Sequence, residues 1–92
     1  MNFTKIDPTI RAWAARNRLP LSTQYQDAEV RSFELVGPSG RAQVWVEVEG
    51  DVVTVYAWDY RRQKQTFSSD PPTLEEALDQ ALQVAQGWCG NP

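Results

Sequence analysis

The fold is decided by residues 43–58, which read QVWVEVEGDVVTVYAW. Apolar and polar residues alternate on both sides of Gly50-Asp51, and a Gly-Asp pair between two alternating runs predicts a two-residue β-hairpin turn. Such a turn pairs Val48 with Val53 and, on the opposite face, Trp45 with Tyr56. The valines of both strands then share one face, which a shift of one residue would prevent. We therefore predict antiparallel strands over about residues 41–49 and 52–59.

The preceding turn extends this sheet by a third strand. Residues 37–40 read Gly-Pro-Ser-Gly, and a four-residue loop there pairs Val36 with Arg41 and Phe33 with Val44. This register predicts a strand over about residues 29–36 and leaves residues 21–27 as a polar connection. The three strands agree on one aliphatic face, which consists of Phe33, Leu35, Val44, Val46, Val48, Val53, Val55 and Ala57. A short edge strand is expected over about residues 64–68, with its register open.

Two helices flank the sheet in the chain. Asp7 as N-cap and Pro8 in the first turn predict a helix over about residues 8–18. Thr73 and Glu76 have the spacing of a capping box before an apolar stripe, which predicts a second helix over about residues 74–86. Gly87 is the expected C-terminal stop of that helix, so Cys89 is expected in an exposed tail.

These elements predict one domain over residues 1–92 with an α+β fold in the order α-β-β-β-(β)-α. The sheet is an antiparallel meander with one aliphatic face, and each helix has an apolar stripe to bury. We therefore expect a two-layer sandwich with both helices packed on that face.

The composition favours a protein without catalytic activity. The chain has no histidine and a single cysteine, so it lacks the commonest general base, the commonest metal ligand and a second thiol. The phosphate-binding and nucleophile motifs of common enzyme families are also missing. We predict no enzyme, no metal and no cofactor. No stretch approaches the ~18 apolar residues of a membrane span, so we expect a cytoplasmic protein that binds no membrane.

The second face of the sheet is rich in aromatic residues and is the expected binding surface. Clustered Trp and Tyr with a nearby Arg are typical of interface hot spots. The predicted partner-binding residues are Arg41, Gln43, Trp45, Tyr56, Trp58 and Tyr60, with Arg61 and Arg62 in the turn that follows. A second interpretation stays open, because cross-strand aromatic pairs also stabilise sheets that bind nothing.

The function expected from these features is that of a non-catalytic protein-binding module. A small acidic inhibitor of a partner protein or complex fits best, either an immunity-type protein or a phage-encoded protein directed against the host or its defences. Nucleic-acid binding through stacked aromatic residues is an alternative, although the net charge of −3 disfavours it. A homodimer joined through the aromatic residues is the other alternative.

Overall fold

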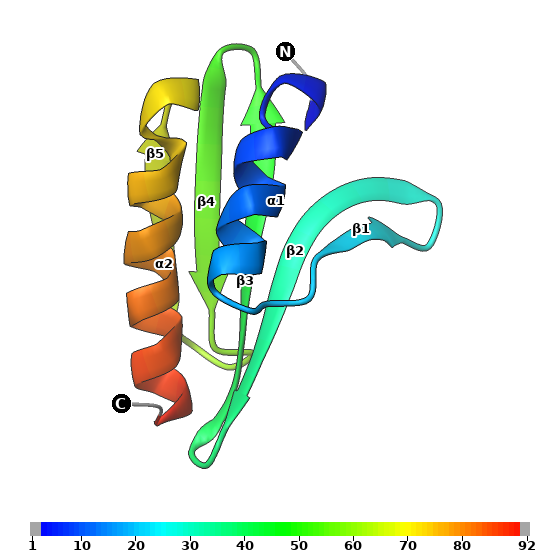
Figure 1. The fold of residues 1–92 in the computed structure, drawn as a ribbon. Helices are drawn as coiled ribbons and strands as arrows, with labels where there is room; N and C mark the ends of the chain where they lie inside the picture. Colours follow the sequence, from blue (N-terminus) through cyan, green and yellow to red (C-terminus); the bar gives the residue numbers. More distant parts are fainter. Residues whose placement is uncertain (1–2, 91–92) are drawn as a thin grey trace.

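The computed structural model describes residues 3–90 and contains one antiparallel sheet with strands in chain order (Figure 1). The strands are β1 (Ser22–Tyr25), β2 (Ala28–Gly37), β3 (Gly40–Glu49), β4 (Val52–Trp58) and β5 (Lys64–Ser69). The helices are α1 (Asp7–Arg16) and α2 (Leu74–Cys89), and 3-10 turns precede them at η1 (Phe3–Lys5) and η2 (Pro71–Thr73). This is the α+β meander expected from the sequence.

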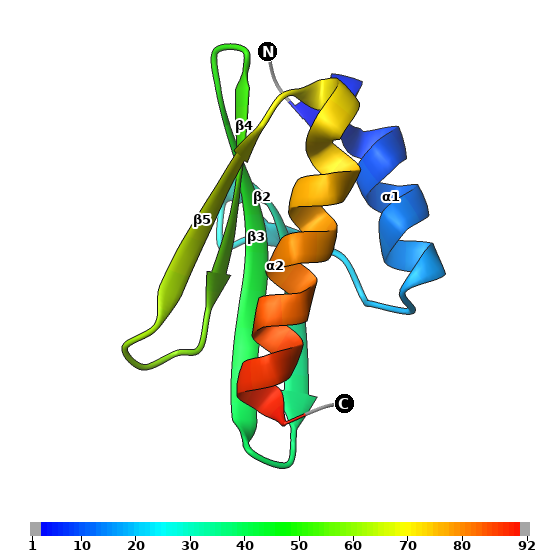
Figure 2. The ribbon, with the colours of Figure 1, turned by 90° about the vertical axis from the view of Figure 1, so that its left-hand side faces the viewer.

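The molecule has two layers, with α1 and α2 on the same side of the sheet (Figure 2). The aliphatic face of the sheet lies against these helices and is called the inner face below. Seven of its eight predicted members are buried, and Val48 at the end of β3 is half-buried. The helices contribute the buried side chains of Ile10, Trp13, Ala14, Leu74, Ala77, Leu78, Ala81, Leu82, Ala85 and Cys89. The core therefore lies between the two layers, as the alternating pattern predicts.

The predicted register of the central strands is confirmed. Val48 pairs with Val53 and Trp45 with Tyr56 across the turn at Gly50-Asp51. Gly50 has a φ of 60°, a left-handed conformation that glycine adopts without steric cost. Phe33 pairs with Val44, as predicted, although the pairing continues to Gly37 and Gly40 so that only two residues form the loop. The open register of β5 is resolved, because Phe67 pairs with Val55 and so lies on the inner face.

The polar connection predicted over residues 21–27 is wrong, because Ser22–Tyr25 forms strand β1 and pairs with β2. The register of this pair shifts between Ser22 and Gln24. Irregular pairing and a polar composition remove the alternation that would reveal a strand in the sequence. The sheet therefore has one more strand at its β2 edge than the sequence suggested.

The predicted helix ends also need correction. Asp7 makes no capping bond, since Ile6 is the N-cap of α1 and the Asp7 carboxylate binds Arg31 instead. The capping box before α2 joins Asp70 to Thr73 rather than Thr73 to Glu76: the Asp70 carboxylate accepts from the Thr73 backbone N–H at 3.1 Å.

Helix α2 continues past Gly87 and stops at Gly90, whose φ is 77°. Cys89 is consequently the last helical residue and is buried rather than exposed in a tail. Its carbonyl accepts a bond from the Ser39 backbone N–H at 3.0 Å, and a Cβ on Gly37 would lie 2.3 Å from the same oxygen. This close approach joins the end of α2 to the β2–β3 turn and explains why the helix runs on.

Candidate functional site

The sheet face opposite the helices carries a continuous row of aromatic rings, called here the aromatic face: Trp45, Tyr56, Trp58 and Tyr60. The rings of Trp45 and Tyr56 are stacked, with centroids 4.8 Å apart and an interplanar angle of 8°. Trp58 meets Trp45 edge-on at 6.5 Å, and Tyr60 lies 4.5 Å from Trp58. Each ring packs against the next, so the half-buried rings form an ordered row.

Two cations of the chain lie against these rings. Arg41 is 4.7 Å from the centroid of Tyr60, and it also forms an ion pair with Glu34. The Lys64 ammonium is 5.0 Å from the centroid of Tyr56 and 5.6 Å from that of Trp45. All three distances are within the ~6 Å range of cation–π attraction. The electron-rich faces of the aromatic rings are therefore accessible to positive charge.

The remaining predicted site residues lie at one end of the aromatic face. Gln43 is half-buried and pairs with Trp58, next to the ring row. Arg61 and Arg62 are exposed in the β4–β5 turn, where the Asp59 carboxylate accepts from the Arg61 backbone N–H at 2.8 Å. The structure thus gathers six of the eight predicted residues on one face and places the two arginines at its end.

A groove of about 890 Å³ runs along this face and continues between β2 and β3. Its lining includes Trp45, Trp58 and Tyr60 from the aromatic face and Tyr25 from β1. It also includes four glutamates, Glu29, Glu34, Glu47 and Glu49, but no lysine or arginine of the described residues. Tyr25 is 68% exposed, so part of the groove wall is an aromatic ring open to solvent.

Glu47 is held in place by the aromatic residues beside it. The Trp45 indole N–H donates to the Glu47 carboxylate at 3.3 Å. A hydrogen bond to the same carboxylate raises the pKa of Tyr56, because the bond favours the protonated phenol. The groove therefore contains a carboxylate in a defined position next to stacked rings.

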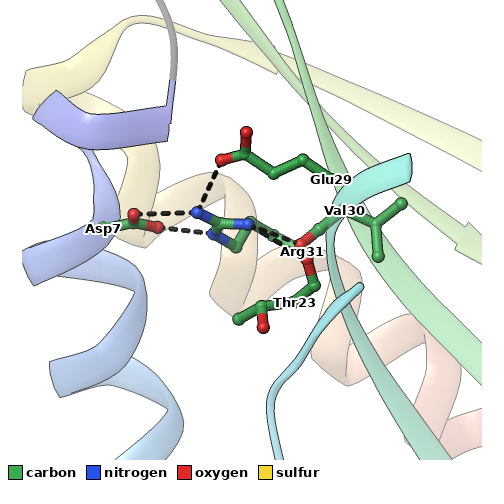
Figure 3. Close-up of polar contacts among 5 residues, drawn as sticks. All are labelled: Asp7, Thr23, Glu29, Val30 and Arg31. Atoms are coloured by element: carbon green, nitrogen blue, oxygen red, sulfur yellow. Dashed lines mark hydrogen bonds and ion pairs between the residues drawn. The ribbon is translucent and has the colours of Figure 1, made fainter. Parts of the chain in front are cut away.

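Sequence reasoning missed Arg31, which lies on the inner face of β2 with only 6% of its surface exposed (Figure 3). Its guanidinium donates to both carboxylate oxygens of Asp7, at 2.6 and 2.9 Å, and to Glu29 at 2.9 Å. A further bond of 2.7 Å goes to the Val30 carbonyl. This arrangement lowers the pKa of Asp7, chiefly through the hydrogen bond from Arg31.

The position of Arg31 in the strand was the available clue. It lies two residues before Phe33, so the period of two places both on the inner face. A buried charge needs a partner, and Asp7 at the start of α1 provides it. The pair joins the first half of β2 to helix α1, and β2 stops pairing with β3 at Arg31.

The cysteine thiol is a candidate nucleophile, and the acidic side chains are candidate metal ligands. Cys89 is fully buried, with its sulfur 3.8 Å from the Leu35 carbonyl oxygen, and burial raises the pKa of the thiol. A neutral, enclosed thiol is a poor nucleophile. Within residues 3–90, no three His, Cys, Asp or Glu side chains are grouped as metal ligands would be.

Comparison of the chain with protein-family models, with curated proteins and with solved structures gives no significant match in any of the three. Neither helix in the described region has the length and apolar character needed to cross a bilayer. The site must therefore be interpreted from its own geometry.

Proposed function

We propose that this chain is a non-catalytic protein-binding module that uses the aromatic face to hold a partner protein. The observation that carries the proposal is the ordered row of Trp45, Tyr56, Trp58 and Tyr60 on the sheet face that no helix covers. Interface hot spots are enriched in Trp, Tyr and Arg, and here all three residue types lie within one patch.

The rigidity of the row supports the proposal. Stacked rings lose little conformational entropy when a partner covers them, so more of the contact energy contributes to affinity. The half-exposed rings also leave apolar surface to bury. A patch of this kind on a small domain is a common mark of a protein–protein contact site.

The proposed role is a small acidic inhibitor that acts in the cytoplasm, either an immunity-type protein or a phage-encoded antagonist of a host complex. The net charge of −3 would steer the chain toward a basic target. Glu47 and Glu49 in the groove, which form no ion pair among the described residues, make the same charge preference local to the site. They also weigh against nucleic acid as the partner, because phosphates would be repelled.

The test is capture and cross-linking of the partner from the cells in which the chain is made, with Trp58→Thr as the site variant. Threonine suits a strand, so the fold should survive the loss of the ring. Trp88→Ala is the matched control, since Trp88 is a half-buried indole on α2. We expect Trp58→Thr to lose a protein that the wild type and Trp88→Ala both retain.

Retention of the partner by Trp58→Thr and Trp45→Thr alike would contradict the proposal. The homodimer alternative is tested by measuring the molar mass of the purified chain by light scattering. A mass of two chains that returns to one in Trp58→Thr would assign the aromatic face to self-association instead.

A further inference from the structure

Strands β2 and β3 pair over seven residues each and then separate, and the groove enters the space between them. They pair from Gly37 and Gly40 as far as Arg31 and Val46. Beyond that point the first residues of β2 no longer pair with β3, although their other edge still pairs with β1. Figure 1 shows this divergence, with β1 and the start of β2 bending out from the rest of the sheet.

The divergence leaves one side of β3 without a neighbouring strand. Glu47, Val48 and Glu49 pair with β4 on their other side, and within residues 3–90 none of the three pairs with a residue of β2. A strand edge of this kind presents N–H and C=O groups that another extended chain can bind. All three residues line the groove, so this edge lies in the groove wall.

The charges beside this edge are unbalanced. Of the four groove glutamates, Glu29 is paired with Arg31 and Glu34 with Arg41. Glu47 and Glu49 have no ion-pair partner among the described residues. Since successive side chains of a strand alternate between faces, these two carboxylates lie on the same face, about 7 Å apart along the strand.

Resting on the proposed function, we propose that the groove takes an extended basic segment of the partner protein, which adds as a short strand to β3 at Glu47–Glu49. Its arginine or lysine side chains at alternate positions have the same repeat as Glu47 and Glu49, so that each meets one carboxylate. The segment continues over Trp45 and Trp58, whose rings favour cations.

The groove is open in the free protein. Arg31 is the residue of β2 at which pairing with β3 ends, and its ion pair with Asp7 ties this point to helix α1, while its bond to Glu29 joins two residues of β2 itself (Figure 3). The space for an added strand is thus present before binding and does not require the sheet to be pulled apart. Such preorganisation lowers the free-energy cost of association.

The experiment follows the indole N–H signals of the chain by NMR during titration with an acetylated eight-residue peptide of alternating arginine and threonine, at about 0.15 M salt so that unspecific attraction is screened. The four tryptophans report separately. Trp45 and Trp58 line the groove, whereas Trp13 is buried in the core and Trp88 donates to Gln63 at 3.0 Å. We expect the Trp45 and Trp58 signals to shift and the other two to stay.

Two comparisons separate the components of the site. Glu47→Gln with Glu49→Gln should weaken binding of the peptide about tenfold, the sum of two exposed ion pairs. Glu75→Gln with Glu76→Gln removes the same net charge from the start of α2 and should change binding less than about twofold. A peptide with the same charges but N-methylated at alternate residues should bind about tenfold more weakly, because it cannot complete a strand ladder.

The inference is overturned if the arginine peptide does not bind, if both glutamine pairs weaken it equally, or if the N-methylated peptide binds as well as its parent. It is also overturned if an alternating glutamate–threonine peptide or a single-stranded octanucleotide shifts the same indole signals. Any of these results would leave the proposed function standing as long as partner capture still depends on Trp58. Retention of the partner by both Trp58→Thr and Trp45→Thr would instead contradict the proposed function.

Discussion

The two faces of the sheet are built from the same strands and differ in almost every other respect. The inner face is aliphatic and closed by two helices, and Val44, Val53 and Val55 on it are fully buried. The outer face is aromatic and polar, and its rings are half-exposed. Because side chains alternate along each strand, one set of residues holds the two layers together and the residues between them lie on the face opposite the helices.

The sharpest test of this division is a pair of substitutions on β2. Phe33 on the inner face is buried and meets Trp13 edge-on at 5.1 Å, so Phe33→Ala should lower the free energy of unfolding by about 3–5 kcal/mol. Val36 on the outer face is 70% exposed, and Val36→Ala should cost less than about 0.5 kcal/mol. Urea unfolding measures both changes in the free energy of unfolding. Similar losses for the two variants would contradict the claim that the inner face supplies most of the stability.

Arg31 is the exception on the inner face, and replacing it tests whether a charge there contributes to stability. Arg31→Met leaves the Asp7 carboxylate, which is 21% exposed, without its partner. We expect a loss of about 2–3 kcal/mol at pH 7, below the range for fully enclosed pairs because water still reaches Asp7. Arg31→Lys should recover only part of this loss, since lysine cannot make the two-pronged bond to the carboxylate.

The effect of Arg31 depends on pH in a defined direction. The pKa of Asp7 is lowered in the folded chain, so Asp7 binds fewer protons when folded than when unfolded. The stabilisation is therefore complete above the unfolded pKa of about 3.9 and is lost as the pH falls through the lower folded value. Urea unfolding at pH 7 and pH 3 should show the difference between wild type and Arg31→Met shrinking at acid pH. A difference that is unchanged at pH 3 would contradict the assignment to Asp7.

The parts of the fold that a sequence predicts well are those set by local alternation. The hairpin at Gly50-Asp51 was predicted residue by residue, because a period of two allows only one register that keeps the valines together. Strand β1 escaped prediction because its residues, Ser22–Tyr25, are polar and its pairing is irregular. The same register also placed the aromatic face, because residues that alternate with the inward-facing valines must lie on the opposite side of the sheet.

The parts that were missed depend on contacts between distant residues. Gly87 has the residue type of a helix stop, but α2 continues to Cys89 because its last turn packs against the β2–β3 turn at Gly37. Asp7 has the residue type of an N-cap, but Arg31 takes its carboxylate across 24 positions of the chain. The end of the β2–β3 pairing at Arg31 and Val46 likewise was not visible in the sequence, since the alternation of β2 alone does not show how far its partner strand follows it. Residue type alone does not decide between a local and a distant partner.

The smallest expected effect concerns the stacked pair on the outer face, and it decides between the two interpretations of the aromatic residues. Trp45→Thr, Tyr56→Thr and the double variant form a cycle that isolates the energy of the contact between the two rings. We expect a coupling energy of about 0.2–1 kcal/mol by urea unfolding, because such pairs on an exposed sheet contribute little beyond strand propensity.

A coupling of about 2 kcal/mol or more would show that the rings serve mainly to hold β3 against β4. Such a result would weaken the argument that Trp45 and Tyr56 form a binding surface. A small coupling has the opposite meaning, because Trp45 and Tyr56 expose apolar surface on a face whose strands are already joined by backbone pairing. Stability would not then account for two large rings held 4.8 Å apart in contact with water, and a bound partner would.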